Sequence, residues 1–95
     1  MPINFEDPNI RLYNVTTPEG VVPLVTRMIN SSNIRWIGWP EKGNQPLMFV
    51  EFKDGSRYVY FGVTRQRAVH AAFAESSGEY LAKKIKGEYE YLKLR

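Results

Sequence analysis

Two aromatic-rich runs on either side of an Asp-Gly pair constrain the fold of this chain more than any other feature. Residues 48–52 (Met-Phe-Val-Glu-Phe) and 57–61 (Arg-Tyr-Val-Tyr-Phe) flank the segment 53–56 (Lys-Asp-Gly-Ser). Aromatic and β-branched side chains favour strands, and Asp-Gly between two such runs is a strong signal for a tight turn. The stretch therefore predicts an antiparallel β-hairpin.

Two registers of this hairpin fit the turn. A two-residue loop of Asp54 and Gly55 places the tyrosines of the second strand on the face opposite Val50. A three-residue loop instead puts Gly55 in the left-handed bulge position and pairs Val50 with Tyr58. Tyr60 then lies on the same face as Val50 and Tyr58, because alternate residues of a strand share a face.

One-sided burial favours the three-residue loop, since a strand that is apolar on one face has a strongly specified register. In that register one face of the hairpin carries Met48, Val50, Phe52, Tyr58 and Tyr60. Glu51 and Arg57 become an ion pair on the other face. The two tyrosines are then core residues, whereas the two-residue loop would expose them as a platform for stacking on bases.

The start of the chain predicts an extended N-terminal arm over residues 1–24, punctuated by four prolines. Residues 10–15 alternate between apolar and polar and predict a short strand. Thr17, followed by proline, also resembles a helix start, which Pro23 would interrupt after about one turn. Further strands are predicted at 25–29 and 34–39, followed by a proline-bounded polar loop at 40–46.

After Val63 the hydrophobic period changes from two to about four, which predicts helices. Thr64 is a favoured N-cap for a first helix at 65–75, and Ser76 with Glu79 forms a capping box for a second helix. The apolar stripe of the first helix is Ala68, Val69, Ala72 and Phe73. The stripe of the second helix is Leu81, Ile85, Tyr89 and Leu92.

These elements predict an α+β fold: a small antiparallel β-meander of three to four strands, followed by two C-terminal helices packed on one face. A chain of 95 residues has room for one domain, which we place at 25–95, after the arm. No apolar run is long enough to span a membrane, and the N-terminus lacks the pattern of a secretory signal. With cysteine absent as well, we expect a cytoplasmic protein without disulfides.

The sequence carries no pattern of catalytic or metal-binding residues. His70 is the only histidine, and neither a cysteine nor a carboxylate pattern accompanies it. Neither a metal-ligand set nor a nucleophilic triad is therefore predicted. The glycine spacing matches no phosphate-binding loop. We expect a protein that is not an enzyme and that needs no cofactor or metal.

Positive charge is concentrated toward the C-terminus. Residues 1–62 carry six basic and six acidic side chains, whereas residues 63–95 carry seven basic and four acidic ones. The basic side chains of that last third are Arg65, Arg67, Lys83, Lys84, Lys86, Lys93 and Arg95. As phosphate contacts they would give salt-sensitive binding without sequence preference. An ordinary solvated helix surface explains the same residues equally well.

Trp36 and Trp39 are three residues apart, so they point to opposite sides of the strand predicted at 34–39. One of them can lie in the core while the other is exposed. An exposed tryptophan is a frequent contact for proteins and for bases, and we treat both as candidate contact residues.

A series of short motifs runs from Arg27 to the C-terminus. They are Ser31-Ser32-Asn33-Ile34, Ile37-Gly38-Trp39, Val50-x-Phe52-x-x-Gly55, Tyr58-Val59-Tyr60, Gly62-Val63, Ala74-x-Ser76-Ser77-Gly78-x-Tyr80, and Ile85-Lys86 with Tyr89. In this combination the chain resembles the KTSC domain family, named after the C-terminus of some lysyl-tRNA synthetases and found also as stand-alone proteins of bacteria and phages. The resemblance implies a compact β-meander followed by two helices, without catalytic activity. RNA binding is the usual suggestion for that family.

The chain departs from the family pattern at several positions. Trp39-Pro40 stands where Tyr-Asp is common, and Thr64 stands where proline is common. Leu81-Ala82 replaces the usual Phe-Asn, so a contact made by that asparagine would be missing here.

The sequence therefore favours a small binding module. Our first expectation is binding of RNA or another nucleic acid through the basic helices and an exposed aromatic side chain. The alternative is a phage or bacterial accessory protein that acts by protein–protein interaction, through the arm or a tryptophan. A homodimer formed through a sheet edge or the helices is a third expectation, and no membrane contact is expected.

Overall fold

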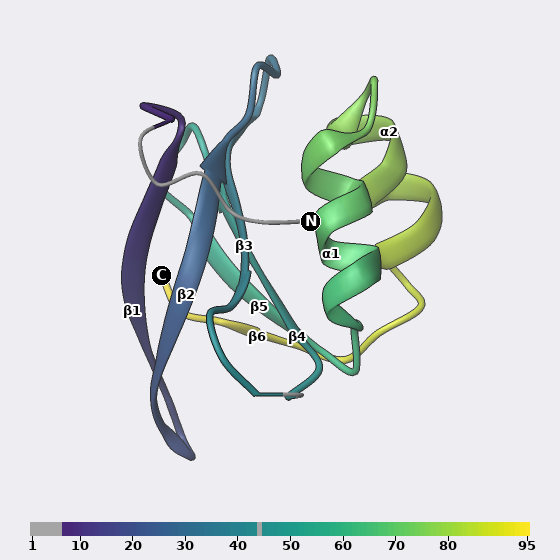
Figure 1. Cartoon of the computed structure of the whole chain (residues 1–95). Helices are drawn as coiled ribbons and strands as arrows, with labels where there is room; N and C mark the ends of the chain where they lie inside the picture. Colours follow the sequence, from purple (N-terminus) through teal and green to yellow (C-terminus); the bar gives the residue numbers. More distant parts are fainter. Residues whose placement is uncertain (1–6, 44) are drawn as a thin grey trace.

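The structure is a computed structural model that describes residues 7–43 and 45–95. Within these residues the chain forms one six-stranded antiparallel sheet and a short helical layer (Figure 1). The elements are β1 (Ile10–Thr17), β2 (Gly20–Met28), β3 (Ile34–Pro40), β4 (Leu47–Phe52), β5 (Arg57–Phe61), α1 (Arg65–Phe73), α2 (Ser77–Tyr80), the π-helical turn η1 (Leu81–Ile85) and β6 (Tyr91–Lys93). Each strand pairs with the next one along the chain, so the sheet is a meander.

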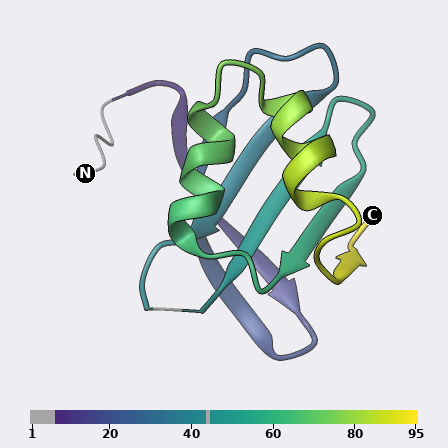
Figure 2. The ribbon, with the colours of Figure 1, turned by 90° about the vertical axis from the view of Figure 1, so that its right-hand side faces the viewer.

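The helical elements all cover one face of the sheet (Figure 1, Figure 2). Between the two layers lies the larger apolar cluster, which we call the helix-side core. It consists of Val25, Ile29, Ile34, Ile37, Trp39, Met48, Val50, Tyr60, Val63, Ala68, Ala71, Ala72, Leu81 and Ile85. Burial of apolar surface, at about 25 cal/mol per Å², holds the helices on this face.

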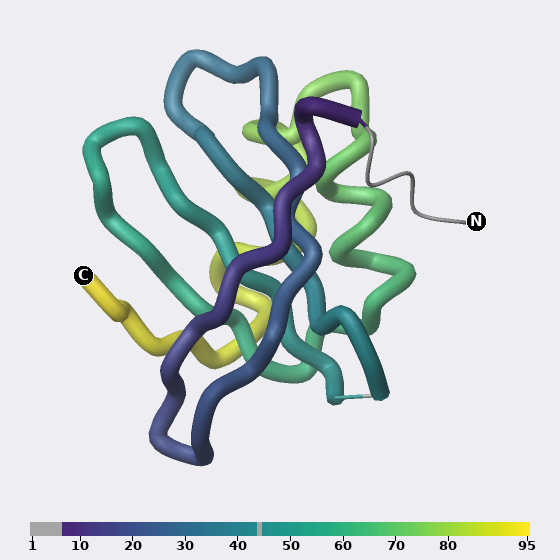
Figure 3. Tube along the Cα trace, turned by 60° about the vertical axis from the view of Figure 1, so that its left-hand side comes forward, coloured from purple at the N-terminus to yellow at the C-terminus, as the bar shows by residue number. Residues whose placement is uncertain are grey.

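The opposite face of the sheet carries a smaller apolar cluster, because the β1–β2 hairpin curls over it (Figure 3). Its buried residues are Val15, Leu24, Leu47, Phe49 and Val59. The ring of Tyr13 in β1 lies 5.3 Å from the ring of Phe49 in β4. In a flat sheet, strands three positions apart would be about 14 Å apart, so this contact requires strong curvature.

The β4–β5 hairpin has the three-residue loop. Val50 pairs with Tyr58, and the amide of Phe52 donates to the carbonyl oxygen of Ser56 at 2.9 Å. Gly55 has a φ of 91° and occupies the bulge position. The register that one-sided burial favours is therefore confirmed, and both tyrosines of β5 face the helix-side core.

The N-terminal segment is not an irregular arm where the structure describes it. β1 and the first part of β2 form a hairpin of the same sheet, and the expected boundary after residue 24 falls inside β2. Pro8 and Pro18 lie in turns, outside the strands. Thr17 donates from its hydroxyl to the carbonyl oxygen of Gly20 at 2.9 Å, closing the β1–β2 turn where a helix start was expected. The predicted number of three to four strands was thus too low. The first six residues of the expected arm lie outside the described part of the chain.

The second helix ends earlier than its apolar stripe indicated. The amide of Lys86 donates to the carbonyl oxygen of Leu81 at 2.9 Å, and Gly87 then takes a φ of 82° that ends the helix. Leu92 lies in β6, opposite the buried Val59 of β5. The expectation of a helix reaching Leu92 was wrong, because pairing with the free edge of β5 outweighs continuation of the helix.

Thr64 and Ser76 cap the helices as predicted, whereas the Glu79 carboxylate of the expected capping box lies 3.6 Å from Lys83 Nζ. Each capping side-chain oxygen accepts a hydrogen bond from the backbone amide three residues later, at 3.2 and 3.3 Å respectively. The expectation that Phe73 belongs to a buried stripe was wrong, since it is 48% exposed. The guanidinium of Arg27 covers its ring at 4.1 Å.

Within residues 7–43 and 45–95, no helix is both long and apolar enough to span a membrane.

Replacing Gly55 with alanine should destabilise the protein by about 1–2 kcal/mol, because residue 55 holds a left-handed conformation that strains an L side chain. Gly78→Ala is the matched control. A methyl group there would meet Asn33 Oδ1 at an ordinary 3.7 Å, and alanine favours a helix over glycine. Urea unfolding measures both variants, and equal losses at the two positions would contradict the three-residue turn.

Candidate functional site

The basic residues expected to share one surface are divided among several contacts. Arg65 donates from its guanidinium to the carbonyl oxygens of Pro40 and Gly43 at 2.9 and 2.8 Å, which ties α1 to the β3–β4 connection. Lys83 lies 3.6 Å from the carboxylate of Glu79, one helical turn away. Arg65 therefore has a structural role, and the charge of Lys83 is partly compensated.

Three more of these basic residues lie on separate elements. Arg67 is half-buried on α1, Lys84 is exposed on η1, and Arg95 is exposed after β6. The backbone carbonyl of Arg95 accepts a hydrogen bond from the amide of Arg57 at 3.2 Å, which fastens the end of the chain to β5. The seven basic residues are thus spread from α1 through η1 to β6 and the end of the described chain.

Four aromatic rings meet on the helix-covered face of β4, β5 and β6. Tyr58 is central: the ring centroids of Phe52, Tyr60 and Tyr91 lie 5.7, 6.4 and 5.7 Å from its own. Pairs of this kind contribute about 0.5–1.5 kcal/mol each beyond the burial of area. Tyr60 is buried whereas Tyr91 is 62% exposed, so the cluster runs from the core to the surface.

Two of the predicted lysines lie over this cluster. Lys86 follows η1, and its Nζ lies 5.4 Å from the ring centroid of Phe52. Lys93 lies opposite Tyr58 in the β5–β6 pair, with its Nζ 5.8 Å from that ring. Cation–π contacts of this kind contribute about 0.5–1 kcal/mol at exposed sites. The end of the helical layer and the last strand thus bring positive charge to the same rings.

A groove of about 470 Å³ lies beside the cluster, and we call it the aromatic groove. It is lined by Ser32, Asn33, Phe52, Lys53, Asp54, Ser56, Tyr58, Tyr60 and Lys86. Its walls therefore combine aromatic rings, hydroxyl and amide groups, and lysine side chains. Such a wall offers ring faces for stacking, polar atoms for hydrogen bonds and cations for an anionic ligand.

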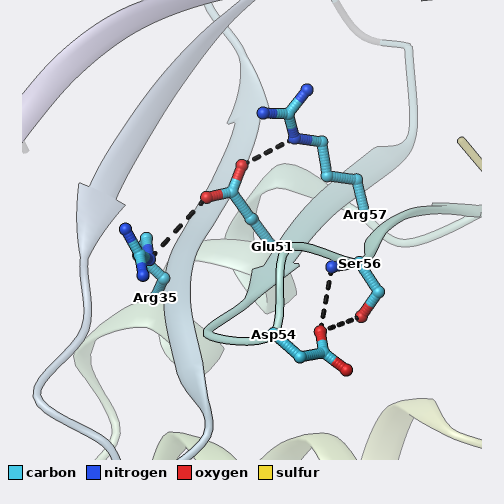
Figure 4. A network of polar contacts seen from close by, with 5 residues as sticks. All are labelled: Arg35, Glu51, Asp54, Ser56 and Arg57. Atoms are coloured by element: carbon cyan, nitrogen blue, oxygen red, sulfur yellow. Dashed lines mark hydrogen bonds and ion pairs between the residues drawn. The ribbon is translucent and has the colours of Figure 1, made fainter. Parts of the chain in front are cut away.

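Asp54, the one carboxylate among the described residues of this lining, is held by its own turn (Figure 4). Its Oδ1 accepts hydrogen bonds from the hydroxyl and the amide of Ser56, at 2.6 and 2.9 Å. These two bonds lower the pKa of Asp54, the hydroxyl having the larger effect. Burial raises the pKa of Tyr60, which keeps its phenol neutral near pH 7.

The two tryptophans lie on opposite faces of β3, as their spacing predicts. Trp39 is buried in the helix-side core at 2% exposure, too deep to contact a partner. Trp36 is half-buried beside the smaller cluster, with the guanidinium of Arg11 5.3 Å from its ring. Of the pair, Trp36 is the one that can reach a ligand.

A second groove, of about 660 Å³, opens beside Trp36, and we call it the basic groove. It is lined by Asn9, Arg11, Arg27, Met28, Ile29, Asn30, Arg35, Trp36 and Lys53. Sequence reasoning missed it, because its cations come from residues 1–62, whose net charge is zero. Pairing of neighbouring strands brings these separate segments together.

Glu51 lies between two arginines on the face opposite the aromatic groove (Figure 4). Its carboxylate is 2.7 Å from Arg57 Nε and 3.9 Å from Arg35 Nε. The short hydrogen bond to Glu51 raises the pKa of Arg57. The predicted cross-strand ion pair is confirmed, while Arg35, with a 53% exposed side chain, is held only weakly.

No group of three or more histidine, aspartate and glutamate side chains is placed to hold a metal ion within residues 7–43 and 45–95. His70 is exposed on α1.

The family model of the KTSC domain matches residues 30–89, more than half of the chain. The chain belongs to the KTSC family. The matched segment of this KTSC protein runs from β3 through η1 and includes the whole lining of the aromatic groove. β1, β2 and β6 lie outside it. No curated protein matches the sequence.

Replacing Arg65 with alanine should lower stability by about 1 kcal/mol, because two backbone carbonyls lose a charged donor. Lys84→Ala removes the same charge from an exposed site and should stay within about 0.5 kcal/mol of the parent. Thermal unfolding compares the two variants. Equal effects would show that the Arg65 contacts contribute nothing to stability.

Replacing Asp54 with alanine should destabilise the protein at neutral pH, because Ser56 loses its acceptor. The folded-state pKa of Asp54 is lowered, so the stability that it contributes is complete above the unfolded-state pKa of about 3.9 and is lost as the pH falls through the folded-state pKa. The difference between parent and variant should therefore shrink in acid. Urea unfolding at a series of pH values measures it, and a constant difference would contradict an ionised Asp54 in this turn.

Proposed function

We propose that this KTSC protein binds single-stranded RNA at the aromatic groove. The supporting observation is the convergence of Lys86 and Lys93 on rings that reach the surface through the exposed Tyr91. Bases present a ring face for stacking whatever their identity, and phosphates attract the neighbouring cations. Binding of this kind is salt-sensitive and tolerant of sequence.

The lysines are suited to exchange one contact for another. Each ammonium group is at the end of a long, flexible side chain, and its contact with the ring below it is weak. A base that stacks on Tyr91 or Phe52 can displace the ammonium, which then moves to the adjoining phosphate. Ring and charge would thus both be used by one nucleotide.

The polar part of the groove favours RNA over DNA. Ser32, Asn33 and Ser56 line the same groove and offer donors and acceptors to a ribose 2′-hydroxyl. The basic side chains of Lys83 and Lys84 line neither groove, so the proposed site is the aromatic groove and not the helical surface expected from the sequence. We propose binding without a chemical step.

Lys86→Ala and Lys93→Ala should each weaken binding of oligouridine and lower the slope of log K against log salt by about 0.7, the value for one lost contact to a single strand. Tyr91→Ala should cost about 1–3 kcal/mol of binding free energy through lost stacking. Fluorescence anisotropy at several salt concentrations measures both effects.

Lys84→Ala is the matched control for these lysine variants, since it removes an equal charge from a residue outside both grooves. It should leave the affinity within about twofold of the parent, because Lys84 is exposed and contacts between exposed charges contribute little. If Lys84→Ala weakens binding as much as Lys86→Ala does, the aromatic groove is rejected as the site.

A protein partner at β1 is the second candidate function. β1 is the first strand in the described sheet order, and Leu12 and Val21 on the β1–β2 hairpin are 59% and 62% exposed. Deleting residues 1–24 cannot test it, since this removes β1 and part of β2. Leu12→Lys with Val21→Lys keeps the strands, and light scattering after gel filtration should show loss of a dimer if β1 joins two copies.

A further inference from the structure

The aromatic groove and the basic groove meet at Lys53. This residue lines both, and among residues 7–43 and 45–95 it is the only one common to the two linings. Lys53 is exposed at the β4–β5 turn, and its amide donates to the carbonyl oxygen of Asn33 at 2.8 Å. That bond holds the β4–β5 turn against the β2–β3 loop at one end of the sheet (Figure 3).

The basic groove is suited to a polyanion. Among the residues that the structure describes, its lining contains Arg11, Arg27, Arg35 and Lys53 and no carboxylate. Arg27 is already engaged, because its NH1 donates to the carbonyl oxygen of Ala72 at 2.9 Å. The other three remain available for phosphates.

Two acidic groups, Glu51 and Asp7, make their short hydrogen bonds to groups other than these cations. Glu51 approaches Arg35 only at 3.9 Å and makes its short hydrogen bond, at 2.7 Å, to Arg57. Asp7 accepts a hydrogen bond from the amide of Asn9 at 2.8 Å, so its carboxylate is directed to its own turn.

Trp36 supplies a ring to the same groove. Arg11 lies over it at 5.3 Å, as Lys86 and Lys93 lie over the rings of the aromatic groove. The same combination, a partly exposed ring with a cation above it, is thus repeated on the two sides of Lys53.

We propose that the two grooves form one continuous path for a single RNA strand, which passes round the end of the sheet over Lys53. The strand stacks on Tyr91 or Phe52 at one end and on Trp36 at the other, and Arg11 and Arg35 hold the phosphates of the second half. This inference rests on the proposed RNA binding at the aromatic groove and adds a second, independent contact region to it.

Oligouridines of two lengths test the path, since single-strand sites on small domains span roughly 4–16 nucleotides. One oligonucleotide of about 4 and one of about 12 nucleotides fit one groove or both. The variant Arg11→Gln with Arg35→Gln should weaken the long oligonucleotide about tenfold and lower its salt slope by about 1.4, while the short one changes by less than about twofold. Arg35→Gln alone, at a side chain held only weakly, repeats the test with the least effect on folding.

Tryptophan fluorescence supplies a second readout. The long oligonucleotide should quench Trp36 and the short one should not, and Trp36→Phe should abolish the difference, because Trp39 is buried. Lys84→Gln is the matched charge control for the arginine variants.

The outcomes separate this inference from the function on which it rests. Binding of both lengths with no selective loss in the arginine variants overturns the second half of the path and leaves the aromatic groove as the site. An equal loss for both lengths also overturns it, because it indicates a general field effect. If neither length binds, the proposed function fails together with the path.

Discussion

The turn between β4 and β5 sets the face on which the rings of Phe52, Tyr58 and Tyr60 lie. Its left-handed Gly55 allows the amide of Phe52 to donate to the carbonyl oxygen of Ser56. This bond fixes the register in which the rest of β4 pairs with β5. A slip of one residue would move Tyr58 and Tyr60 to the opposite face. The ion pair of Glu51 with Arg57 supports the same register from that opposite face.

The C-terminal strand completes the aromatic cluster that this turn begins. Because the helix ends at Gly87, the chain can return to the free edge of β5 and place Tyr91 and Lys93 opposite Tyr60 and Tyr58. A helix continued to Leu92 would hold these side chains on the helical layer, away from the rings. The exposed part of the cluster therefore depends on where one helix stops.

Features that depend on close neighbours in the chain were predictable. The hairpin, the caps at Thr64 and Ser76, and the opposed tryptophans each follow from contacts within a few residues. The spacing of Leu81, Ile85, Tyr89 and Leu92 fits a helix, and it led to the wrong prediction that the helix reaches Leu92. No local signal reveals the edge of β5, with which Leu92 pairs instead. The part that β1 plays in the sheet was likewise underestimated. Pro8 and Pro18 lie in the turns that flank β1, and its partner strand was expected only from residue 25.

The amino-acid sequence was enough for the register of the central hairpin, for the order of elements from β3 to α2 and for membership of the KTSC family. These depend on periodicity, turn chemistry and capping, which act over short stretches of chain. Only the folded sheet decided which charges meet which rings. Lys53 shares one groove with Lys86 and another with Arg11 and Arg35, although these residues are far apart in the chain, because electrostatic and stacking contacts depend on distance through space.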